Sequence, residues 1–151
     1  MYNFQLNDGG RAEAGFSGKT GDCVTRAIAI AMNIPYKEVY DDMNKFIGSL
    51  RQTKKIKSSS SRTGISKTVS RRYITERLGW TWVPCMGIGT GCKVHLTPNE
   101  LPKGRIIAKV SKHLVAVIDG VIQDTYDCSR NGTRCVYGYY INPWDKSVRG
   151  F

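Results

Sequence analysis

The sequence has few of the features that mark membrane, secreted and repeat proteins. No apolar run approaches the roughly 20 residues that a helix needs to cross a bilayer. The first eight residues carry no basic region followed by an apolar core, so no secretory signal is predicted. No internal repeat is visible, which argues against a solenoid or a propeller. We therefore expect a cytoplasmic protein without membrane contact, in a compartment that keeps thiols reduced.

Acidic residues are also scarce, with 12 Asp and Glu against 23 Lys and Arg, for a net charge of +11. A length of 151 residues suits one domain with a hydrophobic core and is short for two. Hydrophobic residues make up 40% and aromatic residues 10% of the chain, as in a globular protein. We expect one domain over residues 1–151.

The positive charge is concentrated in residues 51–77, which hold nine Lys or Arg and one acid, Glu76. Such a segment attracts an acidic protein or a nucleic acid and speeds the encounter. The other interpretation is a flexible, solvated loop at about 51–65, which the serine run 58–61 favours. The candidate contacts for a nucleic acid or an acidic partner are Lys54, Lys55, Lys57, Arg62, Lys67, Arg71 and Arg72.

Helical patterns come before strand-like patterns along the chain. The glycine-rich start predicts an irregular arm. Amphipathic spacing and end signals then predict helices over 22–32, 35–50 and 66–78. Short runs rich in β-branched and aromatic residues predict strands over 80–84, 105–111, 113–118, 121–126 and 135–141. Helices followed by an antiparallel sheet indicate an α+β fold.

Histidine is limited to two residues, His95 and His113. His113 opens a strand, whereas His95 lies in a loop near Pro98. Cys23 is expected in the first turn of the first helix, where the backbone dipole favours a thiolate. A free cysteine is otherwise most often a small buried hydrophobe, so Cys23 needs a partner to be reactive.

The dipeptide Asp119-Gly120 predicts a two-residue hairpin turn. This turn sets Ile118 opposite Val121 and, further along, makes His113 and Asp124 diagonal neighbours on one face. The alternative is a strand-end histidine and an unrelated surface carboxylate. A thiol, a base and an acid in this chain order suit a thiol hydrolase, because the thiol needs a base and the base needs an orienting group.

The chain resembles the papain-like cysteine hydrolases, in particular compact members related to the double-glycine bacteriocin-processing peptidases. The matching features are Gly21-Asp22-Cys23 leading a helix, His113 opening a strand, and Asp124 in the next strand. The resemblance implies N-terminal helices packed on a C-terminal antiparallel sheet. It also implies that Cys23 is the nucleophile of a thiol protease, His113 the general base and acid, and Asp124 the orienting residue.

A second resemblance, to small phage- and plasmid-borne proteins, rests on the Gly-Asp-Cys and Lys-His-X-X-Ala-Val-Ile-Asp-Gly patterns. It implies an accessory protein of a mobile element, acting in the host cytosol.

The sequence departs from the papain-like pattern at the oxyanion hole. Such families place a glutamine about six residues before the cysteine, where this chain has Ser17. The upstream Gln5 and Asn7 are the other candidate donors, together with the backbone N–H of Cys23. Loss of one donor costs roughly a hundredfold in rate, so this position bears directly on activity.

The remaining four cysteines are Cys85, Cys92, Cys128 and Cys135. Structural zinc sites mostly use cysteine pairs two to four residues apart, and these pairs are farther apart, so no metal or cofactor is expected. The dipeptide Asn131-Gly132 predicts a hairpin that sets Cys128 opposite Cys135. In a reducing cytosol we expect all of these thiols to be free.

The leading hypothesis is a cysteine peptidase or amidase that acts on an amide or thioester bond of an acidic protein or peptide. Acyl transfer with the same triad stays open, because the pocket decides the acceptor. The alternative is a non-catalytic module on the same fold that binds a nucleic acid or a host protein through residues 51–77.

Overall fold

The computed structural model describes residues 4–15, 22–50, 65–87, 89 and 91–144. Its centre is a six-stranded sheet in the order β1-β5-β4-β3-β6-β2. The strands are β1 (Phe4–Leu6), β2 (Thr81–Pro84), β3 (Arg105–Val110), β4 (His113–Ile118), β5 (Val121–Asp124) and β6 (Gly138–Ile141). The helices are α1 (Cys23–Met32), α2 (Tyr36–Ser49) and α4 (Lys67–Arg72), which continues into a π-helical turn (Tyr73–Arg77). The α+β class is therefore confirmed.

The sheet is mixed, so the expectation of a purely antiparallel sheet is wrong at one edge. The strand β1 pairs in parallel with β5, whereas the other strand pairs are antiparallel. The irregular arm predicted at the N-terminus thus contains a strand. Three residues are too few to show an alternating pattern, and the pairing depends on the free edge that β5 offers.

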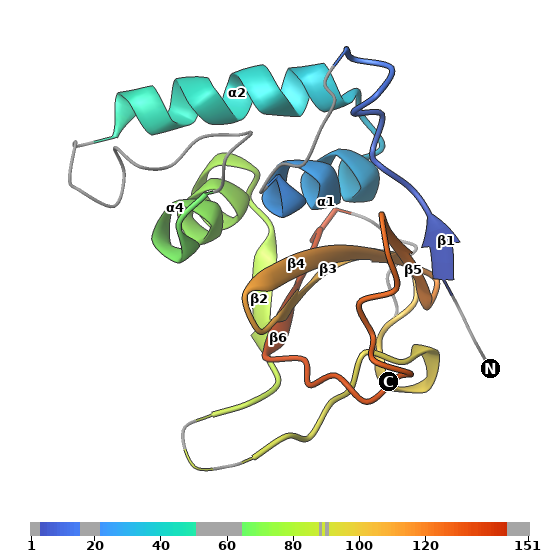
Figure 1. Cartoon of the computed structure of the whole chain (residues 1–151). Coiled ribbons are helices and arrows are strands. Elements are labelled where there is room, and N and C mark those ends of the chain that lie inside the picture. The colour runs from blue at the N-terminus through green and yellow to red at the C-terminus, as the bar shows by residue number, and fades with distance from the viewer. Residues whose placement is uncertain (1–3, 16–21, 51–64, 88, 90, 145–151) are drawn as a thin grey trace.

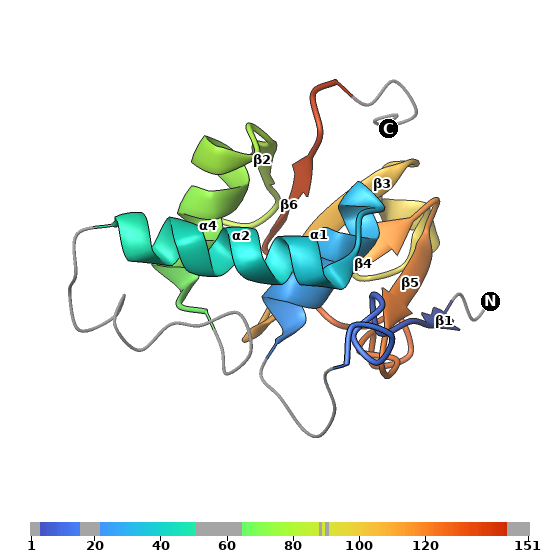
Figure 2. The same cartoon turned by 90° about the horizontal axis from the view of Figure 1, so that it is seen from above.

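The two faces of the sheet are covered differently (Figure 1). Helix α1 packs on one face, and Ile28 and Ala31 of α1 share a core with Ile107 and Ala116 of the sheet. Figure 2 shows α2 crossing outside α1. Loops cover the other face, where they bury Leu96 and other side chains. Because α1 lies between the sheet and α2, residues 24–31 are buried all round rather than along one stripe.

The predicted turn at Asp119-Gly120 is present, with φ of 50° and 81°. The predicted pairing of Ile118 with Val121 is confirmed. The ladder between β4 and β5 ends at the pair Ala116–Gln123, and Asp124 pairs with β1 instead.

The turn at Asn131-Gly132 is also present, with φ of 59° and 77°. The predicted pairing of Cys128 with Cys135 is wrong, because Arg130 is left-handed as well (φ 53°) and turns the chain out of the ladder. Cys135 instead forms a disulfide with Cys92, which also corrects the expectation that both thiols are free. Cys23, Cys85 and Cys128 are free.

No helix among the described residues is long and apolar enough to span a bilayer.

Candidate active site

Cys23 is the first residue of α1. Asp22, at the N-cap position, makes no side-chain cap of the helix. Its carboxylate instead accepts hydrogen bonds from the Tyr36 hydroxyl (2.6 Å) and from the guanidinium groups of Arg11 (3.1 Å) and Arg26. The N–H groups of a first helical turn have no intrahelical acceptors and carry partial positive charge. The Cys23 thiol therefore lies where a negative charge is favoured.

His113 is the first residue of β4 and directly follows a tight turn. Lys112 has a φ of 56°, and the guanidinium of Arg134 donates to the carbonyl of Ser111 at 2.5 Å. Arg134 also donates to the carbonyl of Cys128 at 3.2 Å. Two loops that approach the imidazole are therefore tied together by one side chain. The His113 residue is 8% exposed.

The Asp124 carboxylate, at the end of β5, holds the imidazole from one side. Its Oδ2 lies 2.6 Å from Nε2 of His113, and its Oδ1 accepts from the Thr125 N–H at 2.7 Å and the Arg26 guanidinium at 3.2 Å. Because Nε2 is held by the carboxylate, Nδ1 is the nitrogen left for the Cys23 thiol, which lines the same pocket and whose pKa His113 lowers. The structure thus brings together the three residues that the sequence singled out.

The electrostatics favour an ion pair within this group. Burial works against the charged forms, but hydrogen bonds to Asp124, Cys128 and Cys23 outweigh it and raise the pKa of His113 to about 11. Burial likewise opposes a Cys23 thiolate, yet the hydrogen bond and charge of His113, with the Arg26 charge, lower the pKa of this thiol. The Asp124 pKa is lowered against its own burial, by His113 first. The charged forms of these groups therefore stabilise one another: a Cys23 thiolate, a His113 imidazolium and an Asp124 carboxylate.

Cys128 is a second thiol beside the imidazole. It is 1% exposed, and ligand atoms of Cys128, His113 and Asp124 lie within 4.8 Å of one another. Burial raises the pKa of Cys128. Asp124 is already neutralised by Arg26 and His113, so a metal ion here would have to displace both partners. We therefore interpret Cys128 as a buried, protonated thiol beside the imidazole and not as a metal ligand.

The thiol and the imidazole line a pocket of about 400 Å³. Lys67, Lys109 and Lys112 also line it, and no acidic side chain of the described residues does. None of these three lysines is ion-paired with another described residue. The pocket beside Cys23 is therefore positively charged.

The predicted oxyanion donors lie elsewhere. Gln5 and Asn7 exchange hydrogen bonds with Gln123, at 3.2 Å and 3.1 Å. They line a separate cavity of about 420 Å³, which neither Cys23 nor His113 lines. Gln123 precedes Asp124, and alternation along β5 turns it to the other side of the strand. Ser17 lies outside the described residues.

The basic residues proposed for binding divide into three groups. Lys54, Lys55, Lys57 and Arg62 lie outside the described residues. Lys67 lines the pocket of Cys23. Arg71 is exposed, and Arg72 is paired with Glu76 at 2.7 Å.

Arg26 is a site residue that the sequence analysis missed. Its guanidinium lies between the carboxylates of Asp22 and Asp124, and the residue is 6% exposed. It therefore links the start of α1 to the acid of β5. The signal was the four-residue spacing of Asp22 and Arg26, which places opposite charges on one helix face.

Comparison with protein-family models, with curated proteins and with solved structures gave no match.

Proposed function

We propose that the protein is a thiol hydrolase, a cysteine peptidase or amidase with a papain-like arrangement of Cys23, His113 and Asp124. One observation carries the proposal: the imidazole shares a pocket with a thiol of lowered pKa and has a carboxylate 2.6 Å from its Nε2. The cysteine at a helix start and the histidine opening a strand support the papain-like assignment. A merely structural cysteine has no need of this arrangement.

The proposed reaction has two steps. The Cys23 thiolate attacks the carbonyl carbon of an amide or thioester, and His113 gives its Nδ1 proton to the leaving group as the carbon–nitrogen or carbon–sulfur bond breaks. The neutral imidazole then takes a proton from water, which attacks the acyl-enzyme and releases the acid and the thiolate. Asp124 keeps the ring oriented and stabilises the imidazolium throughout.

The first turn of α1 supplies the oxyanion site in this proposal. The N–H of Cys23 and the helix dipole face the carbonyl oxygen that becomes negative. Gln5 and Asn7 line a separate cavity that does not include Cys23, so they add no donor in this conformation. We expect slow turnover for this reason.

The three pocket lysines favour an anionic acyl group, such as a peptide with an acidic side chain near the scissile bond. Three cations in one recess attract a carboxylate and hold it near the thiolate. This substrate class fits the acidic partner expected from the charge of the chain.

A matched pair of acylating probes tests the proposal with the full chain. Mono-p-nitrophenyl glutarate and p-nitrophenyl pentanoate have acyl groups of the same length and differ in one carboxylate. We expect one acyl group on Cys23 by peptide mass spectrometry. The glutarate should react about tenfold faster, which corresponds to about 1.4 kcal/mol.

The variants separate the thiol chemistry from the choice of substrate. Cys23→Ala should take up no acyl group, and Cys85→Ser should react as the wild type does. Lys109→Met and Lys112→Met should lose the preference for glutarate and still react with pentanoate. Acylation spread over several cysteines, or none at all, would contradict the hydrolase and leave the binding module.

A further inference from the structure

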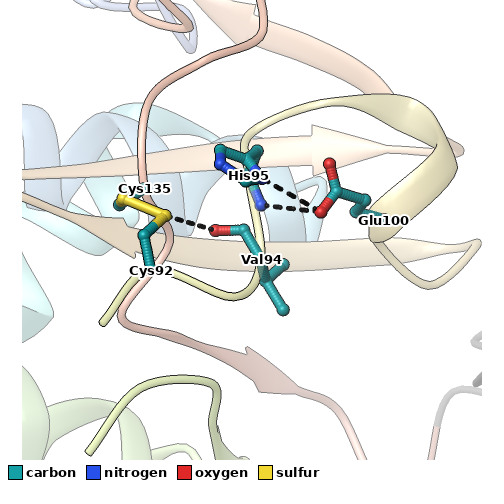
Figure 3. The surroundings of a disulfide bond; sticks show 5 residues. All are labelled: Cys92, Val94, His95, Glu100 and Cys135. Atoms are coloured by element: carbon teal, nitrogen blue, oxygen red, sulfur yellow. Dashed lines mark hydrogen bonds and ion pairs between the residues drawn. A yellow bond between two sulfur atoms is a disulfide. The ribbon is translucent and has the colours of Figure 1, made fainter. Parts of the chain in front are cut away.

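The second histidine also lies beside sulfur. Cys92, His95 and Cys135 bring two Sγ atoms and a ring nitrogen within 4.8 Å of one another. Cys92 and Cys135 are joined as a disulfide, with 5.7 Å between their Cα atoms. Figure 3 shows the His95 imidazole between this disulfide and the Glu100 carboxylate.

The backbone holds the three residues together independently of the disulfide. His95 and Cys135 are partners in an isolated antiparallel bridge, and the next residue, Leu96, donates its N–H to the Arg134 carbonyl at 2.8 Å. Cys92 is close to His95 because only two residues separate them. That spacing falls within the range found between ligands of one zinc ion.

Glu100 fixes the orientation of the imidazole. Its Oε1 lies 3.1 Å from Nδ1 of His95 and also accepts the His95 backbone N–H at 3.3 Å. A carboxylate on Nδ1 keeps the proton there and leaves Nε2 as a lone-pair donor toward the sulfurs. Metal-binding histidines are commonly held by a carboxylate in this way.

We propose that this cluster binds one Zn²⁺ ion when its disulfide is reduced. Two thiolates and a neutral imidazole suit zinc, which takes sulfur and nitrogen ligands in a tetrahedral arrangement. Cys92 is exposed, so water completes the coordination from the solvent side. Zn–S bonds of about 2.3 Å set the sulfurs about 3.8 Å apart, so the ion and the disulfide exclude each other.

Opening the disulfide requires two electrons, which a phosphine reductant supplies. A phosphine reduces the disulfide by taking oxygen from water, which gives two thiols and one phosphine oxide. Binding of Zn²⁺ then forms two Zn–S bonds and releases two protons, while His95 binds through a lone pair without losing a proton.

Cobalt provides a visible probe of this site in the full chain. The protein is reduced with tris(carboxyethyl)phosphine under argon and titrated with Co²⁺. We expect thiolate-to-cobalt charge-transfer absorption that saturates at one ion per chain and disappears when Zn²⁺ is added. The oxidised protein should show no such absorption.

Variants locate the ion. Cys92→Ser and Cys135→Ser should each remove the charge-transfer band or reduce it strongly. His95→Ala keeps both cysteines and the disulfide, so we expect it to fold as the oxidised wild type does. Once reduced, it should nevertheless bind Co²⁺ far more weakly than the reduced wild type. Glu100→Gln should weaken binding about 10- to 100-fold.

Cys85→Ser and Cys128→Ser are the matched controls and should bind Co²⁺ as the wild type does. The inference is overturned if the reduced protein shows no charge-transfer band, or if His95→Ala binds Co²⁺ as tightly as the wild type. Loss of the band in Cys128→Ser rather than Cys92→Ser would also overturn it, because the ion would then lie beside His113.

Discussion

The two histidines of this chain each lie between sulfur and a carboxylate, but in opposite surroundings. His113 is 8% exposed, with its Nε2 on Asp124 at 2.6 Å, whereas His95 is half-buried with its Nδ1 on Glu100 at 3.1 Å. The first imidazole faces a free thiol, and the second faces a disulfide. Sulfur, imidazole and carboxylate therefore come together twice, once with a free thiol and once with a disulfide.

Charge accounts for much of this difference. Asp124 is held by Arg26, which in turn is held by Asp22 at the start of α1. This buried network keeps the carboxylate negative and the imidazole protonated, which suits proton transfer. The Glu100 carboxylate is half-exposed, and its only ion pair with a described residue is with His95. Glu100 holds Nδ1 of His95, which leaves Nε2 for a ligand.

The largest expected effect comes from Arg26→Met, which leaves Asp22 and Asp124 buried without their shared cation. We expect the free energy of unfolding to fall by about 3–5 kcal/mol, the usual cost of breaking a buried ion pair on one side. Urea denaturation monitored by circular dichroism measures it.

Arg72→Met is the matched control, because Arg72 pairs with Glu76 at a half-exposed position four residues away. Its loss should change the free energy of unfolding by no more than about 0.5 kcal/mol. Equal losses of unfolding free energy in the two variants would show that the buried network around Asp124 stabilises the fold no more than an exposed ion pair does.

The second effect concerns the reactivity of Cys23. His113→Ala removes the partner that lowers the thiol pKa, so at pH 6 alkylation of Cys23 by iodoacetamide should slow about 100-fold. An ordinary thiol with a pKa of about 8.5 is ionised to well under about 1% at that pH. Quenched samples analysed by peptide mass spectrometry give the rate.

His95→Ala should leave this rate unchanged, because the second cluster does not line the Cys23 pocket. Cys128 is an internal control, since burial protects it and raises its pKa. A slow rate in both histidine variants would mean that the two clusters are not separate.

Much of the candidate site could be predicted because local rules determine it. Asp119-Gly120 admits the left-handed turn that sets the pairing of β4 with β5, and this pairing carries His113 toward Asp124. Cys23 opens an apolar helix, and its place at the helix start also follows from nearby residues.

Other features depend on contacts between distant segments. The partner of β1 is an edge more than a hundred residues away, and three residues carry no pattern for it. Arg26 was missed because a charge is not expected among the buried residues of α1. Hairpin counting set Cys135 opposite Cys128 with both thiols free, and it failed because Arg130 is left-handed and Cys135 is bonded to Cys92.

The smallest expected effect is a change in how stability depends on pH. His113 has a raised pKa in the folded chain, so its contribution is complete below pH 6.5 and declines as the pH rises toward 11. Cys23 has a lowered pKa, so its contribution is complete above pH 9.0 and declines as the pH falls. Between pH 6.5 and 9 the two contributions oppose each other in the wild type.

Cys23→Ser removes one side of that balance. The free energy of unfolding should then fall more steeply between pH 6.5 and 9 than in the wild type, by up to about 1.4 kcal/mol per pH unit. Urea titrations at a series of pH values measure the slope. Cys85→Ser is the matched control, because burial raises the pKa of this thiol above 9.0 and it does not titrate in this range. If Cys23→Ser and the wild type have the same slope, Cys23 and His113 do not form an ion pair.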